Sequence, residues 1–264
     1  MAEAAYVYCV LGGAADVDDI EGVDSRHTVH AVRHRGLTAL ASAVPLDEFG
    51  AEPLKRNLND MQWLERTARA HQRVLDRALA LGAIVPLRLC TVYSDEAGVR
   101  AMLEREHDVL AATLERLAGR DEWGAKLIGN PRALREGAED PGPTATPGSG
   151  HAYVASVRRD RRIRDEVRRA ARQVAQDVHR ALGEHAVATR VLRKPPRELS
   201  GDAGELLLNG AYLVDRKRAA EFRAVATDLD ERHRARGLRL ELTGPWPPYS
   251  FVADDRERAR ADVR

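Results

Sequence analysis

The sequence predicts an α+β protein with two domains, each a modified ferredoxin-like (split βαβ) sheet with helices packed on one face. Its 264 residues are enough to form two separate cores. Apolar residues recur with a period of two in some segments and of three to four in others, as is typical of strands and helices. From residue 122 onward these segments follow the order β-α-β-β-α-β, which is that of the split βαβ unit.

The N-terminal domain is predicted over residues 1–120, with the order β-β-β-α-β-α. This order resembles the same unit with its first helix replaced by the loop 12–24. The C-terminal domain is predicted over residues 121–252 and contains a loop at 129–150, in which nine of 22 residues are Gly or Pro. Such a run supports neither a helix nor a strand ladder. Residues 253–264 are predicted to form a charged tail.

The first three strands are predicted at residues 5–11, 27–34 and 37–44. The first reads AYVYCVL, a continuous apolar run that indicates a buried strand. Arg35 and Gly36 separate the second strand from the third, so these two strands are expected to form a hairpin.

The first long helix is predicted to have Pro53 in its first turn and to end at Gly82. Its apolar stripe, at steps of three and four, comprises Leu54, Leu58, Met61, Leu64, Ala68, His71, Leu75 and Ala78. A strand at 83–92 follows.

A second helix is predicted between an N-cap at Ser94 and Gly119. Serine is a favourable N-cap, and Asp95 and Glu96 suit the positive end of the helix dipole. The apolar stripe of this helix comprises Val99, Leu103, Leu110, Leu114 and Leu117.

The second domain is predicted to begin with a strand at 122–129 and a helix from about 151 to 182. The stripe of that helix comprises Ile163, Val167, Ala170, Val174, Val178 and Ala181. The remaining elements are strands at 186–194 and 205–215, a helix around 222–233 that is closed by Gly237, and a strand at 238–244.

Composition and charge argue against several classes of protein. The net charge is +1, whereas nucleic-acid-binding domains are clearly basic. No apolar run reaches eighteen residues, so no membrane span is expected. The N-terminus lacks the pattern of a secretory signal, and we expect a cytoplasmic protein. Cys9 and Cys90 lie in apolar runs and are expected to be buried thiols.

The sequence offers no motif for catalysis or for a cofactor. The sequence contains neither the P-loop motif G-x-x-x-x-G-K-[ST] nor the dinucleotide-binding motif G-x-G-x-x-G after a predicted strand. One predicted strand carries His27, His30 and His34, but a further metal ligand is not evident. His71 lies on the apolar stripe of the first long helix, and we interpret it as a core or interface histidine. We therefore predict no enzyme, no metal and no cofactor.

Eight arginines lie between residues 158 and 172. Three carboxylates interleave with them, and two pairs have the i,i+4 spacing of helix ion pairs, each worth about 0.3 kcal/mol. These pairs are Arg161 with Asp165 and Arg162 with Glu166. We interpret the stretch as a solvated or protein-docking helix face rather than a nucleic-acid site.

The stretch LTGPWPPYSFV at 242–252 concentrates aromatic residues in a chain that is only 5% aromatic. Its two consecutive prolines are expected to hold the chain extended, as a stiff rod that presents the neighbouring aromatic side chains. One interpretation is that the aromatic side chains fold back and cap the core of the second domain. The other is that part of the rod is an exposed partner-binding edge.

Four stretches resemble the gas vesicle protein GvpL/GvpF family, in the order of that family and along nearly the whole chain. They are YVYCVL; MQWLERTARAHQRVLDRAL leading into IVPLRLCTVYSDEAGVRAML; HAYVASVRRDR; and ELLLNGAYLVDRKRAAEFRAVA running to LELTGPWPPYSFV. The LTGPWPPYSFV ending is the most specific part, and the stretch that holds Trp63 and His71 is the next.

The resemblance implies a non-enzymatic minor component or assembly factor of gas vesicles, the gas-filled protein shells that give some prokaryotes buoyancy. It implies binding to the hydrophobic shell protein and to other accessory vesicle proteins, with neither nucleic acid nor membrane as a partner. It also implies a location on the vesicle in the cytoplasm and a fold of two modified ferredoxin-like domains. The positions expected to bind partners are Trp246, Pro247, Pro248, Tyr249, Phe251, Trp63 and His71.

The alternative is a ferredoxin-like regulatory module that binds a small molecule or RNA. RNA-binding sheets of this kind present a pair of aromatic side chains to the bases. The strand predicted at 205–215 offers only Tyr212.

Overall fold

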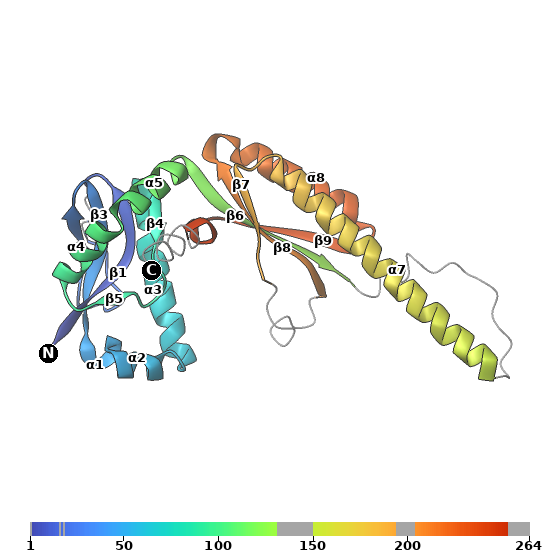
Figure 1. The fold of residues 1–264 in the computed structure, drawn as a ribbon, viewed down its shortest axis with the longest axis horizontal. Coiled ribbons are helices and arrows are strands. Elements are labelled where there is room, and N and C mark those ends of the chain that lie inside the picture. The colour runs from blue at the N-terminus through green and yellow to red at the C-terminus, as the bar shows by residue number, and fades with distance from the viewer. Residues whose placement is uncertain (1, 16, 18, 131–149, 194–203, 253–264) are drawn as a thin grey trace. The chain divides into compact units, whose positions relative to one another are not determined.

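The chain folds into two units that together make an α+β protein with two antiparallel sheets and packed helices (Figure 1). This computed structural model describes residues 2–15, 17, 19–130, 150–193 and 204–252. Most of the predicted loop at 129–150 and all of the predicted tail at 253–264 lie outside the described residues. Unit 1 comprises Met1–Asp121 and Trp246–Arg264, and unit 2 comprises Glu122–Pro245.

The sheet of unit 1 has the strand order β2-β3-β1-β4, and β5 also pairs with β1. Its strands are β1 (Glu3–Gly12), β2 (His30–His34), β3 (Leu37–Pro45), β4 (Ile84–Pro86) and β5 (Val92–Tyr93). The predicted hairpin between β2 and β3 is confirmed. Its turn residues Arg35 and Gly36 have φ values of 47° and 80°, and positive φ at both positions is what a two-residue type I′ turn requires.

The first long helix is interrupted, so the prediction of one continuous helix is wrong. The segment forms α1 (Leu46–Phe49), α2 (Ala51–Asn57) and α3 (Met61–Leu81). The carboxylate of Asp60 caps α3 by accepting hydrogen bonds from the backbone N–H groups of Gln62 and Trp63, at 2.9 and 3.2 Å. Polar side chains before Asp60 compete with the helix for backbone groups, because the amide of Asn59 donates to the carbonyl of Lys55.

Two further predicted elements are also divided. The strand predicted at 83–92 becomes β4 and β5, since the chain turns between them with Cys90 at a φ of 63°. The second helix becomes α4 (Glu96–Arg105) and α5 (His107–Leu117). Asp95 rather than the predicted Ser94 is its N-cap, and its carboxylate accepts from the N–H of Gly98 at 2.8 Å. A carboxylate here also interacts favourably with the helix dipole.

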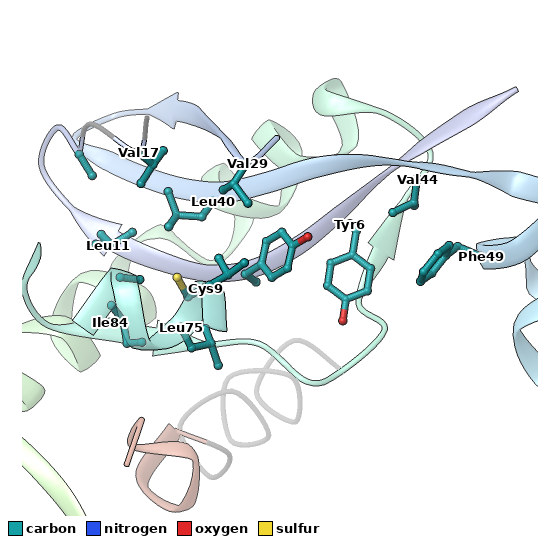
Figure 2. Packing of buried hydrophobic residues seen from close by; sticks show 14 of the residues in the cluster. Tyr6, Cys9, Leu11, Val17, Val29, Leu40, Val44, Phe49, Leu75 and Ile84 are labelled. Carbon is teal, nitrogen blue, oxygen red and sulfur yellow. The ribbon is translucent and has the colours of Figure 1, made fainter. Parts of the chain in front are cut away.

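Helices cover both faces of the sheet in unit 1. Successive side chains of a strand point to opposite faces, yet every residue of β1 from Ala4 to Leu11 is buried. On one face, Tyr6 and Leu11 belong to the same core cluster as Leu75 of α3 (Figure 2). Helices α4 and α5 contact the same strands and bury Val99, Met102, Leu103, Leu110, Leu114 and Leu117 outside that cluster. The prediction of helices on one face is therefore wrong for this unit.

The sheet of unit 2 has the strand order β7-β8-β6-β9. Its strands are β6 (Arg120–Gly129), β7 (Ala188–Val191), β8 (Glu205–Asp215) and β9 (Leu238–Trp246). Helices α7 (Gly150–Gly183) and α8 (Ala219–Arg234) pack against each other and against β8, on the same side of the sheet (Figure 1). A short 3-10 turn, η2 (Arg216–Arg218), leads into α8.

The core of unit 2 lies between this sheet and its two helices. It contains Trp123, Leu127, Val178, Leu182, Tyr212, Phe222 and Leu229 among its buried residues. The hydroxyl of Tyr212 lies 2.7 Å from Nδ1 of His179 on α7. The aromatic side chain that the RNA-binding alternative would need on an open sheet surface is thus fully buried.

Candidate functional site

The C-terminal aromatic segment, residues 246–252, begins where β9 ends at Trp246. The chain is not a straight rod beyond the two prolines. The N–H of Tyr249 donates to the carbonyl of Pro247 at 2.7 Å, and the N–H of Phe251 donates to the carbonyl of Pro248 at 3.1 Å. These bonds turn the chain after the prolines, and residues 249–252 are helical. The predicted rod is wrong because proline removes its own donor but still accepts, and it suits the start of a helix.

The segment is anchored in unit 1. Phe251 is only 2% exposed and Val252 is buried as well. The guanidinium of Arg116 on α5 donates to the carbonyl of Phe251 at 2.8 Å. The interpretation that these aromatic side chains cap the core of the second domain is therefore wrong, since the buried one, Phe251, belongs to unit 1. Burying a phenylalanine side chain contributes about 2 kcal/mol, so the anchor is substantial.

A buried chain of hydrogen bonds ties the segment to α3. His71 is 3% exposed, and its Nδ1 and Nε2 lie 2.9 Å from the hydroxyl of Tyr6 and 3.0 Å from that of Tyr249. Tyr6 also accepts from the N–H of Cys90 at 2.9 Å. With the ring proton on Nε2, Tyr6 donates to Nδ1 and Nε2 donates to Tyr249, so that both ring nitrogens have a partner.

Burial lowers the pKa of His71 to about 4, and a hydrogen bond with the backbone of Leu87 opposes this shift only in part. Burial also raises the pKa of Tyr6 and of Tyr249 well above their usual value. These three side chains are therefore neutral at physiological pH. Their arrangement suits a structural connection, because neutral groups gain from hydrogen bonds without the cost of burying a charge.

Trp63, the other predicted partner-binding residue outside the segment, lies in the core of unit 1. Its indole Nε1 donates to Oε1 of Glu48 at 2.5 Å, and its ring centroid lies 5.4 Å from that of Phe49. Trp63 and His71 are both buried. Both side chains pack inside unit 1, so a partner cannot reach them directly.

Two aromatic side chains of the segment stay accessible. Trp246 is 45% exposed and Tyr249 is 37% exposed, while Pro247 and Pro248 are buried. The segment thus holds two exposed aromatic side chains on an anchored support. Of the seven residues expected to bind partners, these two are the ones whose side chains a partner can reach over a large area.

A second apolar surface lies where α2 meets α3. Met61 is 74% exposed and Leu58 is also exposed. Sequence reasoning placed both on the buried stripe, since their spacing continues the helical period across the break. The polar pair between them, Asn59 and Asp60, is the signal that could have revealed the break.

Burial accounts for the two cysteines, and ion pairing accounts for two of the histidines on the second strand. Burial raises the pKa of the Cys90 thiol to about 11 and raises that of the buried Cys9 thiol further, so neither is an activated nucleophile. His30 pairs with Glu96 and His34 with Glu104, each on α4. Within the described part of the chain, no three metal-binding side chains come together.

None of the helices in the described ranges combines the length and the apolar character that crossing a membrane requires.

Comparison with solved structures places this fold in a defined class. The crystal structure of the gas vesicle protein GvpF from Anabaena sp. PCC7120 matches with a TM-score of 0.72 and 18% identity, over 95% of this chain and 98% of that chain. GvpF from Microcystis aeruginosa matches with a TM-score of 0.68 and 17% identity, over 94% and 98% of the two chains. The protein is therefore an α+β protein with the fold of GvpF.

Sequence comparison then gives the family. The model of the family "Gas vesicle synthesis protein GvpL/GvpF" matches residues 4–253. Gas vesicle protein L of Streptomyces sp. (strain CB03234) is 40% identical over 221 residues, which are 84% of this chain and 82% of that protein. Gas vesicle protein F of the same strain is 28% identical over 87% of this chain and 90% of that protein. The chain belongs to the GvpL/GvpF family, and the resemblance seen in the sequence is confirmed.

Proposed function

We propose that this protein is a non-enzymatic assembly factor or minor structural protein of gas vesicles that binds the hydrophobic shell protein. The observation that carries the proposal is the C-terminal aromatic segment. Buried Phe251 and the bond from Arg116 to its carbonyl anchor the segment, while Trp246 and Tyr249 keep exposed area on the outside. Tryptophan and tyrosine on a preorganised support are the side chains most often found at the centre of protein interfaces.

The physical need for such a partner follows from the shell subunit. A protein that repels water on one face aggregates before it assembles. An exposed aromatic patch could cover part of that face until the subunit joins the shell. The exposed Met61 suits the same purpose, since its flexible thioether side chain adapts to different apolar partners. Other accessory vesicle proteins are further partners in this proposal, and the site of action is the vesicle in the cytoplasm.

We also propose that both units have ferredoxin-like topology. This proposal is supported by the strand orders β2-β3-β1-β4 and β7-β8-β6-β9. In each unit these follow the order second, third, first, fourth of a split βαβ sheet. Among the described residues between β1 and β2 in unit 1, no helix occurs, which supports a split βαβ sheet whose first helix is replaced by a loop.

Co-expression with the shell protein tests the function. We expect the tagged chain to retain shell protein in the soluble fraction and to co-purify with it. Trp246→Ala should lower the recovered shell protein several-fold, because it removes the more exposed of the two aromatic side chains. The matched control is Val191→Ala in unit 2, an exposed apolar side chain on β7. The proposal fails if the shell protein never co-purifies, or if Trp246→Ala and Val191→Ala behave alike.

A further inference from the structure

The first half of α7 carries a strongly basic surface that the aromatic segment does not explain. The stretch 158–172 contains eight arginines and three carboxylates, a net charge of +5. Figure 1 shows this half of the helix, in yellow-green, extending past the strands and past α8. From Arg158 to Ala170, every side chain that the structure describes is exposed except the half-buried Val167.

Six of the arginines form one row along the helix: Arg158, Arg161, Arg162, Arg168, Arg169 and Arg172. At about 100° per residue, these positions fall within an arc of about 120°. The residues of α7 that face the core begin at Ala171 and continue with Val174, Ala175 and Val178. They lie on a different side of the helix, so the arginine row faces solvent.

Among the α7 side chains that the structure describes, no carboxylate forms an ion pair with an arginine of this row. Neither predicted pair, Arg161 with Asp165 or Arg162 with Glu166, forms an ion pair among the described side chains. All six arginines of the row are exposed. Like charges at this spacing repel one another and weaken the helix, so a partner that supplies carboxylates would relieve the repulsion.

We propose that the arginine row binds an acidic helix of a partner protein. A helix laid along the row can place a carboxylate at every third or fourth position and so match the spacing of the guanidinium groups. Asp165 lies in the middle of the row, between Arg162 and Arg168. A protein partner can set one basic residue opposite Asp165, whereas a uniform row of phosphates would meet an unpaired like charge there. The row therefore favours a protein over a nucleic acid.

Binding of a labelled helical peptide to the full chain tests this proposal. The peptide has about 20 residues, with glutamates at steps of three and four and one central lysine. We expect salt-sensitive binding. The triple variant Arg161→Glu, Arg168→Glu and Arg169→Glu should weaken it at least ten-fold. The matched control replaces with glutamate three exposed arginines on one face of α3, Arg66, Arg73 and Arg77. It should change the affinity less than two-fold.

Reversing the charge of Asp165 tests whether the bound helix places its central residue opposite this position. Asp165→Lys should weaken binding of the peptide with the central lysine and strengthen binding of a peptide whose central residue is glutamate. Equal effects of the two triple variants would overturn the proposal, since only net charge would then matter. Tighter binding of an oligouridylate RNA of matched charge than of the peptide would overturn it as well, in favour of a nucleic-acid site. Shell-protein recovery in the co-expression experiment should be unaffected by the α7 triple variant, so the two proposals fail separately.

Discussion

Single residues join parts of unit 1 that are far apart in sequence. His71 bonds to Tyr6, 65 positions before it, and to Tyr249, 178 positions after it. The sequence predicts that His71 is a core or interface histidine, because it lies on the apolar stripe. Its burial agrees with the core alternative. Its partners could not be predicted, because no local pattern connects residues at such separations.

Protonation of His71 should make unit 1 less stable in mild acid. The unfolded chain takes up this proton near the usual pKa of 6.5, whereas the folded chain holds the pKa at about 4. The unfolded state therefore binds more protons between these values, and stability falls as the pH drops from 6.5 to 4. The contribution lost by pH 4 is about 3 kcal/mol.

Hydrogen exchange of the α3 amides at several pH values between 4 and 7 measures this effect. His71→Gln keeps a neutral polar side chain and should lose the His71 part of the pH dependence. Arg73→Gln, at an exposed position of the same helix, should keep the dependence of the unchanged protein. An identical pH profile for His71→Gln and the unchanged protein would contradict the assignment.

At the scale of the elements, the sequence predicts the strands and helices well but misses their interruptions. Leu58 and Met61 keep a spacing of three across the break between α2 and α3, so the apolar period gives no warning. The break depends on the carboxylate of Asp60, which caps the first turn of α3. The spacing of apolar residues carries no information about such a cap. The same limit applies to the helical turn after Pro248, where a donor from Phe251 decides the conformation.

Removal of the α3 cap gives a test at this scale. Asp60→Ala removes the acceptor for two backbone N–H groups and should lower the free energy of unfolding of unit 1 by about 1 kcal/mol. The midpoint of urea unfolding measures the change. Gln62→Ala, at an exposed neighbour that contributes only its backbone N–H to the cap, should leave the midpoint almost unchanged. A larger loss for Gln62→Ala than for Asp60→Ala would argue against the cap.

On the scale of the molecule, unit 1 is built from two separate parts of the chain. Residues 246–252 continue directly from the last strand, β9, whose earlier residues belong to unit 2, but they group with unit 1. The sequence-based prediction assigns them to the domain that directly precedes them, because it places the end of the second domain at residue 252. Only tertiary contacts, such as that of Arg116 with the Phe251 carbonyl, place them correctly.

Deletion of residues 246–264 should therefore affect the unit that is distant in sequence. The loss of buried Phe251 and Val252 should destabilise unit 1 by about 3 kcal/mol or more. Hydrogen exchange should accelerate in α3 and β1, while the amides of β8 and α8 keep their protection. The single change Phe251→Ala should produce the same pattern to a smaller degree. Faster exchange confined to unit 2 would show that the segment belongs there.

The divided first unit also sets an order of events during synthesis. The ribosome completes β1 to α5 early, yet their last packing partners, Phe251 and Val252, emerge only after the whole of unit 2 has been made. The nascent chain must carry an unfinished apolar surface for more than a hundred codons. Translation speed across unit 2 should thus govern how long that surface is open to chaperones.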